Sequence, residues 1–235
     1  MFVPIYDGNH LKHIRFQYVT LFLVALNIAG FVFQMSGIER PVIASFAIVP
    51  FELLAVQVFG GHAAFSPEAL PVPEMVTLLT YMFFHGDALH LAGNMLFLWV
   101  FGDNVEDACG HARYLVLYLI CGLAGGLVHV MLQPQSVAPL IGASAAVAGV
   151  IAAYLVLHPR VQVWVLIFKF IPLRISAMWL LGAWIAMQIA MLFVPQTGPV
   201  AWWAHIGGIV AGGVLVVFLR RPGVVLFDQE VVPRR

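Results

Sequence analysis

Residues 114–158 read YLVLYLICGLAGGLVHVMLQPQSVAPLIGASAAVAGVIAAYLVLH, and no Asp, Glu, Lys or Arg occurs among them. A polar, proline-containing piece at residues 133–139 divides this stretch into two apolar runs, 114–132 and 141–157. A helix needs about 20 apolar residues, with some tolerance, to cross a hydrocarbon core about 30 Å thick. The stretch therefore predicts two transmembrane helices joined by a short polar connection.

The composition of the whole chain agrees with a membrane protein. Apolar residues make up 62% of the 235 residues and charged residues only 9%, whereas about 25% of a soluble domain is charged. The solvent for most of this chain is therefore expected to be the lipid bilayer. Eleven basic and eleven acidic residues balance, so the net charge gives no reason to expect a nucleic-acid partner.

Four further apolar runs extend this pattern to six predicted spans. They cover residues 16–37, 89–104, 175–194 and 200–219. We therefore predict an all-α polytopic membrane protein, with a large external loop between the first and second helices. The six-helix membrane domain covers residues 16–219, between a cytoplasmic N-terminal segment (1–15) and a cytoplasmic C-terminal tail (220–235).

Two segments need a separate interpretation. The first apolar run follows Lys12 and Arg15 as in a signal peptide, but it is longer than the usual 7–15 residues, so we expect a retained span. Residues 42–59 are long enough to span but contain Pro50 and Glu52. A central charge costs about 2.5–3.5 kcal/mol, so we expect a helix lying in the membrane interface.

The distribution of Lys and Arg predicts the orientation. With six spans and a cytoplasmic N-terminus, ten of the eleven Lys and Arg residues lie inside and only Arg40 lies outside. Both termini are then cytoplasmic. The compact six-span form without an added domain fits a prokaryotic cell membrane, with an organelle membrane as the alternative. Cys109 and Cys121 are expected to be buried, without a disulfide.

Polar groups inside spans are costly and are therefore candidates for function. Spans two, four and six all begin on the same, external side, so their polar residues are expected to meet in one layer near that side. Gln188 lies deeper, in the fifth span. The complete set is His90, Asn94, His129, Ser144, Gln188 and His205.

Ser144 lies in the sequence GASAA at residues 142–146, within the first turn of the fourth predicted helix. The free N–H groups at a helix start and the helix dipole favour a developing negative charge there. A serine among alanines and glycines also suits helix packing, since small residues let helices approach. Ser144 is therefore a candidate nucleophile only if a base lies nearby.

His205 is the candidate base. It shares a helix face with Gly208 and Gly212, at i+3 and i+7, and this face can lie against the small residues of the serine helix. An imidazole is well suited to take a hydroxyl proton near neutral pH. A buried histidine bonded to a carbonyl is the alternative. No Asp or Glu lies deep in a span, so we predict a dyad rather than a triad.

His90 and Asn94 are spaced i, i+4 and lie on one helix face. Both can donate hydrogen bonds to an oxyanion, together with the Ser144 backbone N–H. His85 falls five residues earlier and can shape the same site. A metal site formed by His85, His90 and His205 is disfavoured, because no HExxH motif or close carboxylate accompanies them.

Taken together, these segments resemble the rhomboid family of intramembrane serine proteases. The resemblance covers most of the transmembrane core. It rests on HGDALHLAGNM at 85–95, FGDNVED at 101–107, RY at 113–114, GAS at 142–144 and AHIGGIVAG at 204–212.

The resemblance implies a six-helix fold with a water-accessible cavity and cleavage of transmembrane segments that carry small residues and unstable helices. It assigns Ser144 and His205 as the catalytic dyad and His90 and Asn94 to the oxyanion hole. The remaining matched positions, His85, Gly142, Gly208 and Gly212, have supporting roles. The family uses no cofactor or metal, and the resemblance leaves the oligomeric state open.

Two residues depart from the family pattern. Ala145 replaces a usual glycine after the serine, and Ala148 stands where an aromatic residue often packs on the histidine. The group that orients His205 is therefore left unassigned. Two rival functions are an inactive rhomboid-like protein that binds membrane clients, and a small transporter. The second is disfavoured because the inner halves of spans two, four and six are almost wholly apolar.

Overall fold

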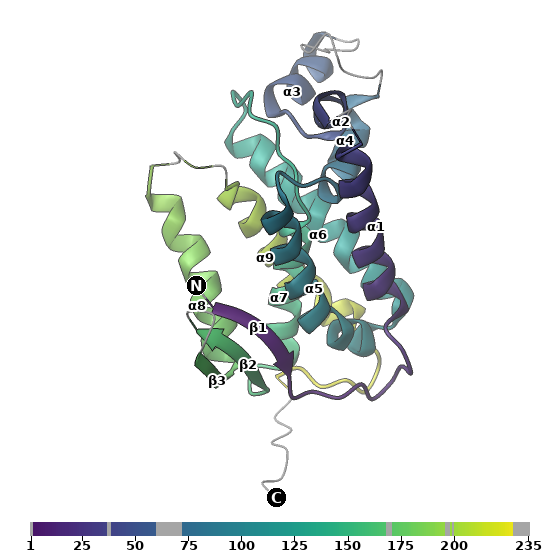
Figure 1. Cartoon of the computed structure of the whole chain (residues 1–235), viewed down its shortest axis with the longest axis vertical. Helices are drawn as coiled ribbons and strands as arrows, with labels where there is room; N and C mark the ends of the chain where they lie inside the picture. The colour runs from purple at the N-terminus through teal and green to yellow at the C-terminus, as the bar shows by residue number, and fades with distance from the viewer. Residues whose placement is uncertain are drawn as a thin grey trace, which may run out of the picture.

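The computed structural model describes residues 2–36, 39–59, 72–167, 171–195, 198 and 200–227. Each of the six predicted runs corresponds to one α-helix (Figure 1), and the run 175–194 also holds the 3-10 turn η2 (Met191–Phe193). Five of these helices begin and end within a few residues of the predicted bounds. The helix predicted at 89–104 ends five residues later than predicted. The six helices are α1 (Tyr18–Gln34), α5 (Ala88–Cys109), α6 (His111–Leu132), α7 (Ser144–Leu157), α8 (Ala177–Ala190) and α9 (Trp202–Leu219).

By length and composition, two of the described helices, α6 and α9, are apolar enough to cross a membrane. Their outer faces, and those of α1 and α8, expose large apolar side chains. Val32 is 64% exposed, Trp179 70% and Val210 60%. An outward apolar surface of this kind suits lipid as the solvent. Six spans remain a prediction.

The segment between α1 and α5 forms short helices: α2 (Glu39–Phe46), α3 (Pro50–Phe59), α4 (Glu74–Thr80) and the 3-10 turn η1 (Tyr81–Phe83). The predicted interfacial helix at 42–59 is thus divided between α2 and α3. Pro50 is the first residue of α3, where its missing N–H costs nothing. Between them, Ile48 pairs with Leu140 in an antiparallel bridge, which joins this region to the connection before α7.

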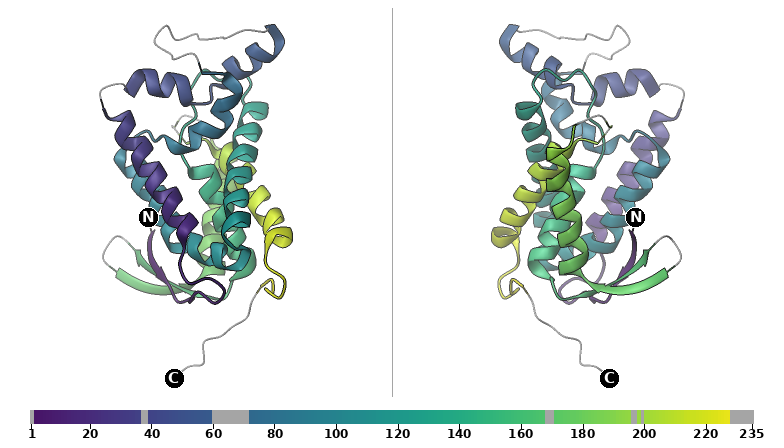
Figure 2. Two further views of the ribbon diagram at one scale, coloured as in Figure 1. Left: turned by 90° about the vertical axis from the view of Figure 1, so that its right-hand side faces the viewer. Right: turned by 90° about the vertical axis from the view of Figure 1, so that its left-hand side faces the viewer.

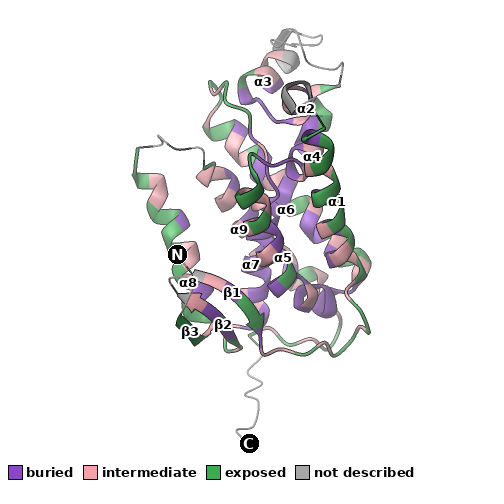
Figure 3. Cartoon of the chain, viewed as in Figure 1, coloured by how far each residue is buried: buried purple, intermediate pink, exposed green. Residues whose placement is uncertain are grey.

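Helix α7 forms the centre of the bundle, and 11 of its 14 residues are buried (purple in Figure 3). Close packing against α9 follows from the glycines on the shared face. A Cβ on Gly208 would overlap the Ala145 carbonyl oxygen, and one on Gly212 would overlap the Gly149 carbonyl oxygen. The predicted contact between these small residues is confirmed. Cys109 and Cys121 are both buried.

The all-α prediction is wrong in one respect, because the chain also forms a three-stranded antiparallel sheet. Its strands are β1 (Phe2–Asp7), β2 (Gln162–Ile167) and β3 (Ile171–Ser176), in the order β1-β2-β3. The sheet lies at one end of the bundle, beside the last turn of α7 (Figure 2). The sequence did not reveal it because β1 and β2 lie far apart in the chain, and a six-residue apolar run does not distinguish strand from helix.

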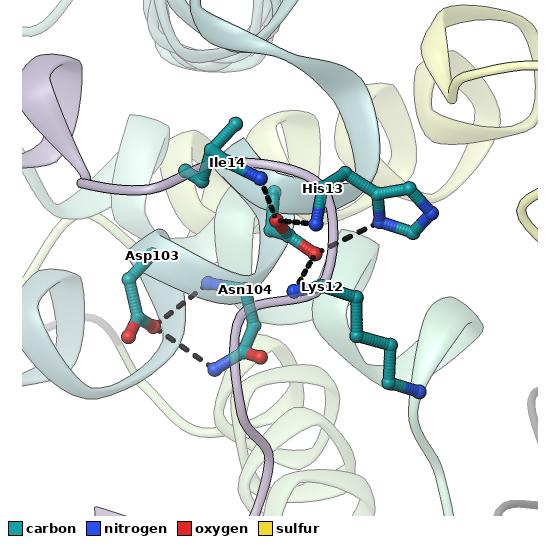
Figure 4. A network of polar contacts seen from close by, with 6 residues as sticks. Lys12, His13, Ile14, Asp103 and Asn104 are labelled. Carbon is teal, nitrogen blue, oxygen red and sulfur yellow. Dashed lines mark hydrogen bonds and ion pairs between the residues drawn. The ribbon is translucent and has the colours of Figure 1, made fainter.

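The N-terminal segment is also tied to the bundle. The Asp107 carboxylate, near the end of α5, accepts hydrogen bonds from the backbone N–H groups of Lys12 (3.0 Å), His13 (2.7 Å) and Ile14 (2.7 Å). The His13 ring Nδ1 donates a fourth, at 3.0 Å (Figure 4). Residues 12–14 therefore form a loop held around one buried carboxylate.

The neighbouring Glu106 caps the start of α1. Its carboxylate accepts from the backbone N–H groups of Val19 (3.0 Å) and Thr20 (2.8 Å), and from the Thr20 hydroxyl (2.7 Å). These N–H groups have no partner inside their own helix. The Gln17 side chain at the N-cap makes no capping bond, so the cap comes from α5. The prediction ended this span at residue 104 because two acids follow, whereas α5 continues to Cys109 with both carboxylates hydrogen-bonded to the N-terminal segment and α1.

Candidate active site

Ser144 and His205 meet where α7 and α9 begin. Ser144 is the first residue of α7, and His205 lies in the first turn of α9. The Ser144 Oγ and His205 Nε2 atoms are 2.9 Å apart, within hydrogen-bonding distance. The contact predicted from the glycine face of α9 is therefore confirmed.

Gln188 holds the other side of the His205 ring. The Gln188 Oε1 atom lies 2.8 Å from His205 Nδ1, and the Gln188 side chain is only 2% exposed. An amide oxygen can only accept, so Nδ1 carries the proton and Nε2 is left with a lone pair toward the Ser144 hydroxyl. This tautomer is the one that lets His205 act as a base.

Sequence reasoning identified Gln188 as a polar group inside a span but gave it no role. Its signal was its isolation in an uncharged run. Trp202 also contacts the imidazole, edge to face, with ring centroids 5.9 Å apart and planes at 83°. Gln188 and Trp202 together orient the ring where an aromatic residue is missing at Ala148.

Gly142 brings His90 next to the serine. Gly142 has a φ of 125°, a conformation that favours glycine. A Cβ there would lie 2.7 Å from His90 Cε1, 2.9 Å from His90 Nε2 and 3.7 Å from Ser144 Oγ. The absence of a side chain at Gly142 therefore leaves the room in which the His90 ring sits near Ser144.

The surroundings of His90 favour Nε2 as a donor. The Asp87 carboxylate caps α5 by accepting from the His90 backbone N–H at 2.8 Å. The Gly86 N–H points to His90 Nδ1 at 3.5 Å, which places the ring proton on Nε2, beside Gly142. Asn94 is buried and donates from Nδ2 to the His90 carbonyl oxygen at 3.1 Å, so one of its two N–H bonds is already used.

His85 supports the backbone that leads to Ser144. Its ring is fully buried, and its Nε2 accepts from the Ala143 N–H at 3.4 Å. Burial lowers the pKa of His85 to about 3, so the ring is neutral and can accept. Gln34 fixes the His85 backbone from α1, donating to its carbonyl oxygen at 2.7 Å and accepting from its N–H at 3.2 Å.

The arrangement combines a hydroxyl, a base in the correct tautomer and a donor beside the hydroxyl. The free N–H groups of the first turn of α7 add further donors at the Ser144 end. This geometry can support attack of a serine oxygen on a carbonyl carbon.

Comparison with known proteins identifies similar chains. The sequence profile of the Rhomboid domain matches residues 72–222. RHOMBOID-like protein 5 of Arabidopsis thaliana is 30% identical over 161 residues, which cover 68% of this chain and 49% of that protein.

Of two shorter matches, one is named as a protease and the other as an inactive protein. The rhomboid protease GluP of Bacillus subtilis is 38% identical over 82 residues, covering 35% of this chain and 16% of that protein. Inactive rhomboid protein 1 of Drosophila melanogaster is 33% identical over 84 residues, covering 36% and 6%. The matched part thus spans half or less of the length of each of these three relatives.

Proposed function

Because this chain belongs to the membrane-embedded rhomboid family, we propose that it is an intramembrane serine endopeptidase. It hydrolyses peptide bonds in or near the transmembrane segments of other proteins. Ser144 and His205 act as a catalytic dyad, with the active site toward the external side of a cell membrane and both termini in the cytoplasm. The observation that carries this proposal is the 2.9 Å contact between Ser144 Oγ and His205 Nε2.

In the first half of the reaction, Ser144 Oγ attacks the scissile carbonyl carbon while His205 Nε2 takes the hydroxyl proton. The carbonyl oxygen becomes an oxyanion, which accepts hydrogen bonds from His90 Nε2–H, the Ser144 backbone N–H and the second N–H of Asn94. As the C–N bond breaks, His205 passes the proton to the leaving amine. The product is an acyl-enzyme on Ser144.

In the second half, water attacks the acyl carbon and His205 takes a proton from it. Collapse of the second tetrahedral intermediate returns the proton to Ser144 Oγ and releases a carboxylic acid. The bond from Nδ1 to Gln188 Oε1 supports both halves, because it strengthens when the imidazole becomes positively charged.

The proposal is tested by labelling the detergent-solubilised protein with a fluorophosphonate probe, which reacts only with an activated serine. The wild type is expected to be labelled, and Ser144→Ala and His205→Ala are not. Equal labelling of all three proteins would contradict the dyad. A reporter transmembrane segment, followed by mass spectrometry of the products, identifies the bond that is cut.

The chain offers matched controls for both residues. Ser176 is the N-cap residue of α8 and makes no capping bond, so Ser176→Ala removes a serine from another helix start. His129→Ala removes a histidine from the outer end of α6. Both variants are expected to be labelled like the wild type.

The inactive rhomboid-like function is the alternative, favoured by the match to the Drosophila protein. It predicts a folded wild-type protein that binds a transmembrane client, gives no product and takes up no probe. The presence of both dyad residues and the Gln188 contact favours the protease.

A further inference from the structure

A second polar site lies where α9 ends, at the same end of the bundle as the sheet (Figure 2). The chain turns back there, and a hollow of about 490 Å³ opens beside the turn. Three arginines line it together with two apolar residues of α9: Arg113, Arg220, Arg221, Val217 and Phe218. The hollow is thus both cationic and apolar.

The backbone at this turn fixes the arginines in place. The Arg221 N–H donates to the Ala108 carbonyl oxygen at 2.8 Å, which ties the turn to the last residues of α5. Gly110 follows with a φ of 85°. A Cβ there would lie 2.9 Å from Arg221 Nη2, so glycine is needed for its conformation, and the guanidinium packs beside it.

Among the residues that the structure describes, no carboxylate forms an ion pair with these arginines. Arg113 Nη1 donates to the Arg220 carbonyl oxygen at 3.3 Å, and Arg220 donates to the carbonyl oxygens of Val217 and Val224. Arg221 Nε is buried and has no hydrogen-bond partner within the same part of the chain. Three guanidinium groups therefore gather positive charge around one small volume.

An apolar stripe leads along α9 to this hollow. Val210, Val214 and Phe218 follow one another at intervals of four residues, on one helix face. They are 60%, 54% and 76% exposed. An acyl chain that lies along this stripe would bring its headgroup to the arginines.

We propose that this hollow binds the phosphate headgroup of an anionic membrane lipid, with one acyl chain along Val210, Val214 and Phe218. Guanidinium groups match phosphate oxygens in charge and in geometry, and basic pockets at the cytoplasmic ends of transmembrane helices favour anionic headgroups. The adjacent stripe favours a lipid over free phosphate, since a free ion gains nothing from an apolar surface. The site lies at the end of α7 away from Ser144 and is distinct from the proposed active site.

Native mass spectrometry of the full chain in detergent, titrated with palmitoyl-oleoyl-phosphatidylglycerol, tests the site. The wild type is expected to bind this lipid more tightly than palmitoyl-oleoyl-phosphatidylcholine. Arg113→Gln/Arg221→Gln is expected to weaken phosphatidylglycerol binding about 25-fold, at about fivefold for each cation. If the double variant does not fold, Arg113→Gln alone tests the site, because this side chain is exposed and its described hydrogen bond goes to a carbonyl oxygen. Phosphatidylglycerol binding is then expected to weaken about fivefold.

The matched control is Arg15→Gln/Arg160→Gln. It removes two exposed cations from the same predicted side of the membrane, outside the hollow, and is expected to bind like the wild type. Equal weakening in this control, or equal binding of the two lipids, would overturn the proposal. Inorganic phosphate that displaces the lipid at equal concentration would show that the site takes the free ion, and would overturn it as well.

Discussion

Gln188 Oε1 on α8 accepts a hydrogen bond from His205 Nδ1 on α9 at 2.8 Å, and both side chains lie within the bundle. This contact gives the proposed base its orientation without a carboxylate. A neutral acceptor fixes the tautomer of the imidazole without placing a second charge inside the bilayer, where a buried charge is costly.

Gln188→Leu removes the hydrogen-bond acceptor and puts an apolar side chain of similar size in its place. A hydrogen bond to a charged group contributes about 1.5–3 kcal/mol, so we expect kcat to fall about 10- to 100-fold with little change in KM. Gln188→Glu keeps an acceptor at the same atom and is expected to retain more activity than Gln188→Leu. Kinetics on a reporter transmembrane segment measure both. Equal losses in kcat for the two variants would indicate a packing role for Gln188.

His90→Ala removes the proposed oxyanion donor beside Gly142. We expect kcat to fall about 10²- to 10³-fold, with a smaller loss for Asn94→Ala because one N–H of Asn94 already bonds to the His90 carbonyl oxygen. Thermal unfolding of both variants serves as the control. A drop in melting temperature that accounts for the lost activity would favour packing over catalysis.

Gly212→Ala places a methyl group against the Gly149 carbonyl oxygen of α7. Overpacking of this kind costs about 1–3 kcal/mol, and it should also separate the dyad by moving α9 away from α7. Gly213→Ala is the matched control, because no atom lies within 4 Å of its added Cβ. Replacing this glycine in a helix is expected to stabilise the protein by up to about 1 kcal/mol. Similar melting temperatures for the two variants would contradict the packing described above.

Asp7 predicts a pH dependence of stability. Its carboxyl group is 4% exposed and accepts from the Tyr154 hydroxyl at 2.5 Å and from Asn104 Nδ2 at 3.0 Å. Burial raises the pKa of Asp7 from 3.8 to about 7. The folded protein therefore holds a proton that the unfolded chain releases between these two values.

The contribution of Asp7 is full below pH 3.8 and is lost as the pH rises through about 7. The free energy of unfolding is expected to fall by at most about 4 kcal/mol over this range. Asp7→Asn cannot ionise, so its free energy of unfolding should exceed that of the wild type increasingly toward pH 8. Denaturant unfolding at several pH values measures the difference. Parallel curves for the two proteins would refute this role of Asp7.

The sequence predicted the positions of the six main helices well, because five of the predicted runs carry no charge and the sixth carries only Asp103 near its end. It also predicted the meeting of Ser144 and His205, because small residues on two facing helices let their backbones pack closely. The sheet and the attachment of residues 12–14 to Asp107 were not predicted. Both join segments about 90 to 160 residues apart, and no local pattern in the chain records such a pairing.

The amino-acid sequence by itself determined the solvent, the helices and which two residues are the candidates for the proposed dyad, because hydropathy and small-residue spacing are local properties. Only the tertiary structure decided which atom orients His205 and where Arg113, Arg220 and Arg221 gather. Those outcomes depend on how α8 and the turn after α9 are placed against distant helices. The 2.8 Å hydrogen bond between Gln188 and His205 depends on how α8 lies against α9, which neither segment determines alone.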